Sequence, residues 1–247
     1  MSNFVIGVEG EVGSGKTTMC KELTKLLPNT VFIDGGMIYK GIMLALRKTK
    51  LTPLDYIKYA GSIKKLLNGD VDVSDLNSFD LMRRLNVEFK IENNISEIYI
   101  NGDKVQESEV QSTSTSMDVS KYASKIDNKS LYEFARSIIY EYGEKQGNNI
   151  IVAGRDLIHI YPEMDAHIFV TCDIDERVER RFKQYEGKVS KDELKEKMLE
   201  RDRLHEEAGF SDKYEKSIIL DVTDCKSVEE SCKKFINTIN EKTDLSL

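Results

Sequence analysis

The stretch GEVGSGKTT, residues Gly10–Thr18, follows the apolar run FVIGV at residues 4–8 and leads into the amphipathic segment KTTMCKELTKLL. It completes the pattern G-x-x-x-x-G-K-[ST] between a predicted strand and a predicted helix, the context that a phosphate-binding loop requires. Glycines let backbone N–H groups surround a phosphate, and the positive end of the helix dipole adds to the attraction. We therefore predict that nucleotide phosphates are bound by Gly10, Gly13, Ser14, Gly15, Lys16, Thr17 and Thr18.

Two side chains of this stretch have distinct expected roles. Lys16 should reach the β- and γ-phosphate oxygens, and it is a predicted catalytic residue. Thr17 has the hydroxyl that such a loop places on Mg²⁺, so a metal–nucleotide complex is expected. A tight turn without any ligand is the alternative for this pattern.

Five apolar runs predict the fold class. They are FVIGV at 4–8, TVFI at 30–33, NIIVAG at 149–154, AHIFVTC at 166–172 and SIILDV at 217–222. Continuous apolar strands separated by amphipathic helices are typical of a parallel sheet covered on both faces. We predict an α/β fold.

Helical and antiparallel segments lie between these runs. A first helix should cover residues 16–27, with Met19, Leu23, Leu26 and Leu27 on one face, a second should follow Asp34, and a third should cover residues 52–67. Short alternating runs at 87–91, 97–102 and 103–108, separated by Asn-Asn and Asn-Gly turns, predict an antiparallel β insertion. The run at 112–116, STSTS, has little packing capacity and predicts a flexible hinge.

These patterns divide the chain into a core and an insertion. The core should comprise residues 1–84 and 119–247, with a helical lid at about 176–214, and the inserted lobe should comprise residues 85–118. We expect the parts to form a single folding unit.

Composition narrows the range of partners. The 247-residue chain has a formal net charge of −7, which argues against a nucleic acid polymer because binding it needs a basic face. Four widely spaced cysteines form no zinc or redox motif, so reduced thiols are expected. The start lacks a signal-peptide pattern, and no run approaches membrane-spanning length. We expect a cytoplasmic protein that binds small molecules, has no contact with membranes and needs no obligate protein partner.

Charged residues cluster at two further places. Arg155 and Asp156 follow the apolar run at 149–154, at the carboxyl end where open α/β sheets bind ligands, and Asp34 ends a neighbouring run. The segments after residue 173 contain Arg177, Arg180, Arg181, Arg201 and Arg203. Two interpretations stay open for these arginines: a solvated helix pair with i,i+4 ion pairs, or a lid that neutralises a transferring phosphoryl group.

Together these residues resemble the cytidylate kinase family, whose members are P-loop kinases that transfer the γ-phosphoryl group of ATP to CMP or dCMP. The likeness covers nearly the whole chain and includes GEVGSGKTT, DGGMIYK, INGDKV, VSKYAS, GRD, RRFKQ and ERD in family order. It implies a three-layer fold around a five-stranded parallel sheet, a β insertion that encloses the nucleoside monophosphate, a helical lid, and ATP with Mg²⁺ as cofactors.

The resemblance also assigns residues. The family's base-reading serine falls on Ser124, its phosphate and base contacts fall on Arg155 and Asp156, and its ribose-side arginine falls on Arg201. Asp34 and Lys40 complete the expected acceptor site. The expected catalytic residues are Lys16, Arg155, Asp156, Arg177 and Arg181.

Five positions depart from the family pattern. Gly35, Lys40, Glu133, His205 and Ala208 stand where the family has Ser or Thr, Arg, Arg, Asp and Arg. Lysine keeps the charge of an arginine but not its two-pronged hydrogen bonding. We hypothesise that Arg136, three residues after Glu133 on the same predicted helix, replaces the missing base-side arginine.

Three functions therefore remain open from the sequence. The first is a kinase of CMP or dCMP with direct in-line transfer. The second is a divergent P-loop kinase of another small metabolite, since the departures lie on the acceptor side. The third is a degenerate kinase that senses nucleotide, although the retained Lys16 and Thr17 argue against it.

Overall fold

The computed structural model describes residues 3–48, 82–83, 85–110, 112–122, 129–185, 189–207 and 217–247. The chain forms two compact units, Met1–Asp34 with Ile139–Leu247 and Gly35–Ile138. The predicted insertion boundaries at residues 85 and 118 stay a prediction.

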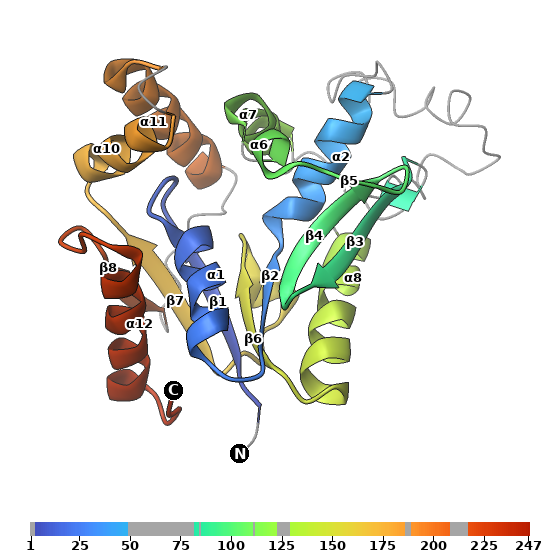
Figure 1. The fold of residues 1–247 in the computed structure, drawn as a ribbon, viewed down its shortest axis with the longest axis vertical. Helices are drawn as coiled ribbons and strands as arrows, with labels where there is room; N and C mark the ends of the chain where they lie inside the picture. The colour runs from blue at the N-terminus through green and yellow to red at the C-terminus, as the bar shows by residue number, and fades with distance from the viewer. Residues whose placement is uncertain are drawn as a thin grey trace. The chain divides into compact units, whose positions relative to one another are not determined.

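The first unit is built on parallel strands. In spatial order they are β2 (Thr30–Asp34), β6 (Asn149–Ala153), β1 (Val5–Gly10), β7 (Ala166–Thr171) and β8 (Ile218–Asp221) (Figure 1). The register pairs Val8 with Ala153 on one side of β1 and Gly10 with Val170 on the other. Each predicted apolar run is confirmed as a strand, and every residue of β1 and β2 is buried.

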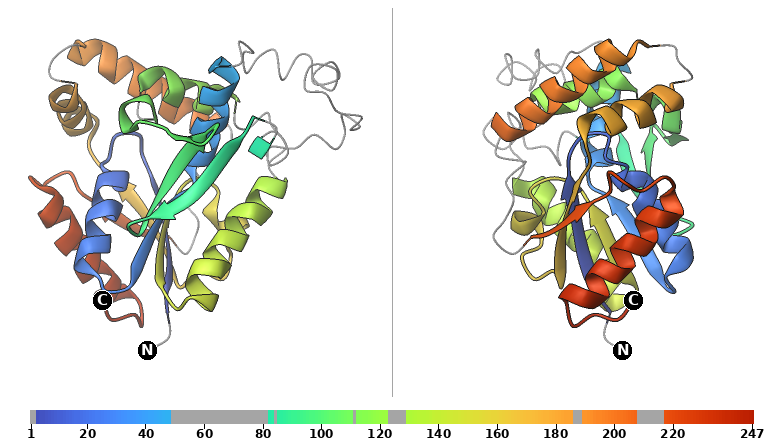
Figure 2. Two further views of the ribbon diagram at one scale, coloured as in Figure 1. Left: turned by 45° about the vertical axis from the view of Figure 1, so that its right-hand side comes forward. Right: turned by 90° about the vertical axis from the view of Figure 1, so that its left-hand side faces the viewer.

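Helices α1 (Lys16–Leu26) and α12 (Val228–Lys242) pack their apolar residues toward these strands. Helix α1 packs against α12, and both lie on the same side of the strands in the right-hand view of Figure 2. The other helices of the unit are η3 (Glu141–Lys145), a single π-helical turn, and α9 (Leu157–Ile160), α10 (Ile174–Gln184) and α11 (Lys191–Glu207). Figure 1 shows that both chain ends lie near the base of this unit.

One predicted core position of α1 is wrong. Met19 and Leu23 are buried as expected, but Leu26 is 53% exposed. The helix ends at Leu26, and the chain turns to an extended conformation at Leu27, whose side chain is buried as predicted.

The second unit places a helix on an antiparallel sheet. Helix α2 (Gly36–Lys48) contacts β3 (Val87–Glu92) and β4 (Ile95–Ile100), and β4 also pairs with β5 (Asp103–Lys104). Positive φ angles at Asn93, Asn94, Asn101 and Gly102 give both turns the left-handed backbone that a two-residue hairpin needs. The predicted β insertion is confirmed as antiparallel strands.

The predicted hinge at 112–116 is wrong, because these residues begin a packed helix. The unit contains α6 (Glu107–Val110), α7 (Thr113–Tyr122) and α8 (Lys129–Tyr140). Ser112 stabilises the start of α7, since the Thr115 N–H donates to Ser112 Oγ at 3.2 Å. Thr115 and Ser116 are buried, Thr115 Oγ1 accepts a hydrogen bond from Ser112 Oγ at 2.8 Å, and α7 as a whole contacts α2.

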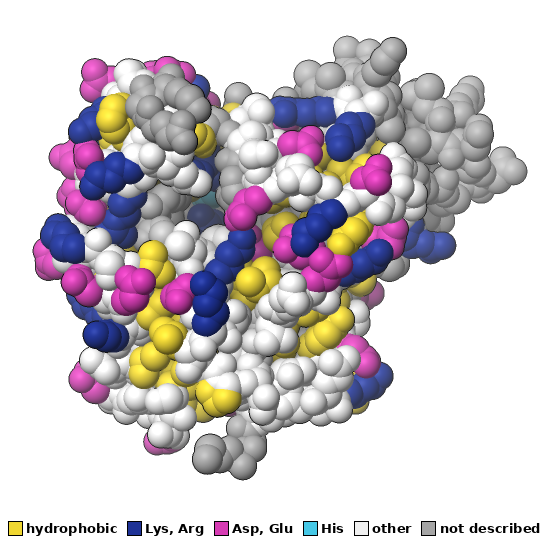
Figure 3. All heavy atoms as spheres, viewed as in Figure 1, with side chains coloured by type: hydrophobic (Ala, Val, Ile, Leu, Met, Phe, Trp, Pro, Cys, Tyr) yellow, Lys and Arg dark blue, Asp and Glu magenta, His cyan; other side chains and the backbone are white. Residues whose placement is uncertain are grey.

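Some expectations lie outside the described residues, namely the helix at 52–67, Ser124, Ala208 and part of the lid. Among the residues that are described, no helix is long and apolar enough to cross a membrane. On the face shown in Figure 3, basic and acidic side chains are intermixed, so that face has no large area of one charge sign.

The close packing of α2 on its sheet makes Gly41 a sensitive position. A Cβ atom there would lie 2.9 Å from Val87 Cγ1 and 3.0 Å from Ile98 Cγ2. We predict that Gly41→Leu lowers the free energy of unfolding by about 2 kcal/mol or more through overpacking, as measured by urea denaturation. Lys48→Leu introduces the same side chain at the exposed end of the helix and should change stability by less than about 0.5 kcal/mol. Equal effects of the two substitutions would contradict this packing.

Candidate functional site

The phosphate loop is set by backbone that only glycine adopts easily. Gly10 has φ 141°, and a Cβ there would lie 2.1 Å from the Val170 carbonyl oxygen of β7. Gly15 has φ 92° and immediately precedes Lys16, the first residue of α1. The N–H groups of the first helical turn therefore face the loop, which makes this end of α1 suitable for an anion.

Lys16 turns its side chain back over the loop. Its Nζ donates to the carbonyl oxygens of Gly10 at 2.7 Å and Glu11 at 2.6 Å, and lies 3.4 Å from Ser14 Oγ. Burial holds the pKa of Lys16 well below its ordinary value, and the positive charge of Arg155 lowers it further. An incoming phosphate would replace these neutral oxygens by charged ones and favour the ammonium form.

Two arginines, Arg155 and Arg201, act on Lys16, and a third, Arg181, acts on Arg201. Burial lowers the pKa of Arg155, and it lowers the pKa of Arg201 to about 10, with Arg181 and Arg155 contributing to the shift at Arg201. Like charges disfavour one another in a buried place, so this cluster is stabilised when an anion with several charges binds. The structure brings together four residues that the sequence singled out separately.

The loop after β6 is held from β1. Asp156 has a left-handed backbone with φ 59°, an uncommon conformation for a residue other than glycine. The next residue, Leu157, donates its N–H to Glu9 Oε1 at 2.7 Å, and Glu9 is completely buried. Glu9 is also the acid that most raises the pKa of Arg155, against the larger opposing effect of burial. This buried carboxylate therefore supports the loop that carries both predicted acceptor contacts.

His205 lies against the same arginine. Arg155 Nη2 is 3.4 Å from His205 Nδ1, which can accept a hydrogen bond only when that nitrogen carries no proton. Burial, followed by the positive charges of Arg155 and Arg201, lowers the pKa of His205 to about 2. The side chain is thus a neutral acceptor where the family pattern has a carboxylate.

The remaining acceptor-side residues fall in different parts of the structure. Asp34 ends β2 opposite Ala153 and is buried, and its charge acts on Arg155. Lys40 lies half-buried on α2, and Arg136 lies exposed on α8 in the second unit. Ser124 is outside the described residues. Contacts of these four residues with an acceptor stay predictions.

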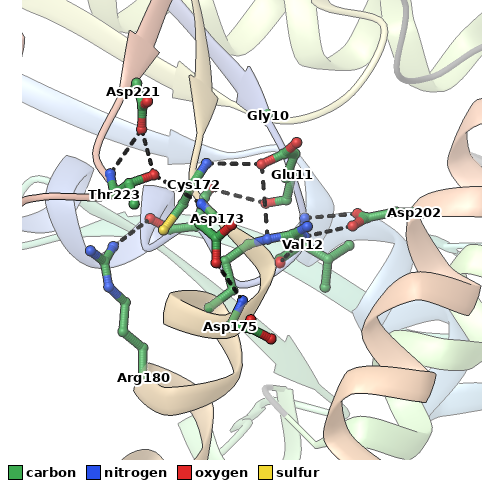
Figure 4. A network of polar contacts seen from close by, with 12 residues as sticks. Gly10, Glu11, Val12, Cys172, Asp173, Asp175, Arg180, Asp202, Asp221 and Thr223 are labelled. Carbon is green, nitrogen blue, oxygen red and sulfur yellow. Dashed lines mark hydrogen bonds and ion pairs between the residues drawn. The ribbon is translucent and has the colours of Figure 1, made fainter.

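The predicted lid arginines differ in their surroundings. Arg181 is half-buried, with Nη1 2.5 Å from Gln184 Oε1 and its guanidinium beside the Tyr185 ring. Arg177 is buried, and it donates to the Val12 carbonyl and to Asp202. Val12 and Asp202 are labelled in Figure 4. A direct contact of either arginine with a transferring phosphoryl group stays a prediction.

Sequence reasoning overlooked two functional candidates here, Glu9 and Asp202, and it named Arg180 only within the group of possible lid arginines. Glu9 could have been found, since a charged residue inside an apolar strand needs a buried partner. Asp202 was noted only as part of the motif ERD, and nothing in the local pattern indicates its partners.

The described part of the chain contains no group of three or more His, Cys, Asp or Glu residues that could hold a metal ion. Thr17, half-buried in the first turn of α1, offers one hydroxyl oxygen. A hard cation would take its other ligands from phosphate and water.

Comparison with known proteins assigns the family. A family model described as cytidylate kinase matches residues 6–241. The chain is 28% identical to the cytidylate kinase of Acholeplasma laidlawii, covering 97% of this chain and 96% of that protein, and 29% identical to that of Aquifex aeolicus, covering 96% of each. It is 31% identical to a bifunctional pantoate ligase/cytidylate kinase of Prochlorococcus marinus, of which it spans 43%. The chain belongs to the cytidylate kinase family and is a nucleoside monophosphate kinase.

The depressed pKa of His205 predicts an acid-sensitive stability. The unfolded state binds a proton near pH 6.5 and the folded state binds it only near pH 2, so the free energy of unfolding is highest above pH 6.5 and falls below it. His205→Asn keeps an acceptor for Arg155 but does not titrate. Urea unfolding should show that the loss of stability between pH 7 and pH 5 is smaller in this variant by about 2 kcal/mol.

The control for this prediction is His159→Asn, which removes an exposed histidine and should keep the wild-type loss between the two pH values. An equal loss in His205→Asn and the wild type would contradict the buried, neutral imidazole.

Proposed function

We propose that this member of the cytidylate kinase family transfers the γ-phosphoryl group of ATP to CMP or dCMP, giving ADP and CDP or dCDP. The observation that carries the proposal is Lys16 in an intact phosphate loop, where the charges of Arg155 and Arg201 act on it and the charge of Arg181 acts on Arg201. Such a cluster suits two phosphorylated substrates that meet at one place. All four cysteines are buried free thiols, which is consistent with a protein that works in a reducing compartment such as the cytoplasm.

On the ATP side, residues Gly10–Thr18 hold the phosphates, and Lys16 moves from the loop carbonyls to the β- and γ-phosphate oxygens. The hydroxyl of Thr17 would hold Mg²⁺, which neutralises part of the phosphate charge when bound. The single protein oxygen fits an ion that keeps water and phosphate ligands.

On the acceptor side, Arg155 and Asp156 stand on a loop that Glu9 fixes, and Arg201 contributes a further positive charge. Asp34, Lys40, Ser124 and Arg136 complete the proposed set. Transfer is direct, because the acceptor's phosphate oxygen attacks the γ-phosphorus without a covalent enzyme intermediate. The protein mainly positions the two substrates and neutralises charge.

A second candidate keeps the reaction and changes the acceptor. His205 supports it, since a neutral imidazole in place of a carboxylate leaves Arg155 and Arg201 with one negative charge fewer beside them than the family pattern provides. A more highly charged small metabolite would then be favoured over CMP.

An acceptor panel tests the proposal. ADP release from Mg·ATP is followed with CMP, dCMP, UMP, AMP and GMP, and we expect the highest kcat/KM with CMP or dCMP. Lys16→Ala should lower this value by about a hundredfold or more, because it removes a charge that stabilises the transferring group. If every acceptor stays at the rate of ATP alone, the assignment of a pyrimidine acceptor is wrong.

The role proposed for Arg136 is tested separately. Arg136→Ala should raise KM for CMP by about tenfold, since a charge-assisted hydrogen bond contributes about 1.5–3 kcal/mol, and should leave KM for ATP unchanged. Ser137→Ala, at the next exposed position of α8, is the matched control. An unchanged KM for CMP in Arg136→Ala would rule out this replacement for the missing arginine.

A further inference from the structure

Helices α10 and α11 hold the phosphate loop at Val12. The Val12 carbonyl accepts a hydrogen bond from Arg177 Nη1 of α10 at 3.0 Å, and the Val12 N–H donates to Asp202 Oδ1 of α11 at 2.9 Å. Arg177 Nη1 also donates to Asp202 Oδ2 at 2.6 Å, which closes a triangle. Both backbone groups of one loop residue are therefore bound by side chains from two different helices.

This triangle, which we call the Val12 latch, is shielded from solvent at Arg177 and Val12, whereas the Asp202 side chain is 26% exposed. Arg177 is 5% exposed, and Val12 packs in an apolar cluster with Val178, Leu194 and Met198 from the same two helices. Buried hydrogen bonds between charged groups are screened little by solvent, so the latch resists local distortion of the loop.

Two neighbouring contacts extend the latch along the loop. Arg180, three residues after Arg177 on α10, donates from Nη1 to the Ser14 carbonyl at 3.3 Å and from Nη2 to Val222 and Cys225. On the other side, Glu11 Oε2 accepts from the Cys172 N–H at 2.9 Å (Figure 4). The carbonyl groups of Val12 and Ser14 are thus directed at α10, which fixes the path of the backbone between them.

We propose that Asp202 and Arg177 are positioning residues for nucleotide binding, which keep the phosphate loop in the conformation that receives ATP. The inference rests on the proposed function, because that proposal identifies ATP as the ligand. A carboxylate beside a polyanion site is electrostatically unfavourable, and its charge acts on Lys16. Its two hydrogen bonds to the loop and to Arg177 offset that repulsion by holding the backbone in place.

Asp202→Asn separates the latch from a purely electrostatic effect. Asparagine has the same shape, but it presents one oxygen and one NH₂ group to Val12 N–H and Arg177, both of which donate, so one of the two bonds is lost. Removing a negative charge near the phosphates would by itself strengthen ATP binding. Loss of the latch would instead weaken ATP binding, so the latch and the purely electrostatic effect predict opposite changes in the Kd for ATP.

The experiment is titration calorimetry of Mg·ATP without any acceptor, which makes its outcome independent of the acceptor's identity. We expect Asp202→Asn to raise the Kd for ATP by about tenfold. Lys195→Ala is the matched control, because it removes the exposed ion pair between Lys195 and Asp175 that joins the same two helices away from the loop. Its Kd should stay within about twofold of the wild type.

Three further variants show whether the pair acts as a unit. Arg177→Lys keeps the positive charge and one donating nitrogen, so it should raise the Kd for ATP less than Arg177→Met does. If a thermal melt shows that Asp202→Asn does not fold, the comparison of these two Arg177 variants replaces it as the test. Arg177→Met combined with Asp202→Asn should bind ATP about as weakly as Arg177→Met alone. An unchanged or lower Kd in Asp202→Asn, or additive effects in the double variant, would overturn the latch. Absence of ATP binding by the wild type would instead refute the proposed function.

Discussion

The buried ammonium group of Lys16 is the interaction on which the rest of the site depends. It is satisfied by carbonyl oxygens of Gly10 and Glu11, which must therefore point toward the inside of the loop. The carbonyls of Val12 and Ser14, the next along the chain, are bound by arginines of α10. The backbone of the loop keeps one conformation because Lys16 binds its carbonyl oxygens from the inside while Arg177 and Arg180 bind them from α10. This conformation leads directly into the first turn of α1.

The same charge distribution explains why the site needs an anion. Burial and the charges of Arg155 and Arg201 lower the pKa of Lys16, and burial and the charges of Arg181 and Arg155 lower the pKa of Arg201. The nearby acids Glu9 and Asp202 are already engaged by backbone N–H groups. Phosphate groups on both substrates would compensate the excess. His205 lies beside Arg155 and is neutral, so it does not compensate this positive charge.

The sequence predicted the parts of the fold that local pattern controls. The apolar runs became strands, the Asn-Asn and Asn-Gly pairs became hairpin turns, and the phosphate loop was recognised from Gly10 to Thr18. Parts that depend on tertiary packing were missed. Ser112–Ser116 lacks apolar side chains, yet Thr115 and Ser116 are buried at the start of α7, which contacts α2. Leu26 has the right spacing for the core, but the helix ends beside it.

The Val12 latch was beyond local reasoning for the same reason. Val12 and Asp202 are separated by 190 positions, and Val12 and Arg177 by 165, so only the folded chain brings them together. Sequence alone placed Arg177 in a dense group of arginines. It could not decide between surface ion pairs and a lid that neutralises the transferring phosphoryl group. The structure distinguishes it from Arg181 by its burial and by its bond to the loop.

The most direct test of this account follows the transferred group itself. The protein is incubated with Mg²⁺, CMP and ATP labelled with ³²P at the γ-phosphate, and the products are separated by chromatography. The account predicts that the label appears in the β-phosphate of CDP. Label that stays in ATP, or that appears only as inorganic phosphate, would contradict it.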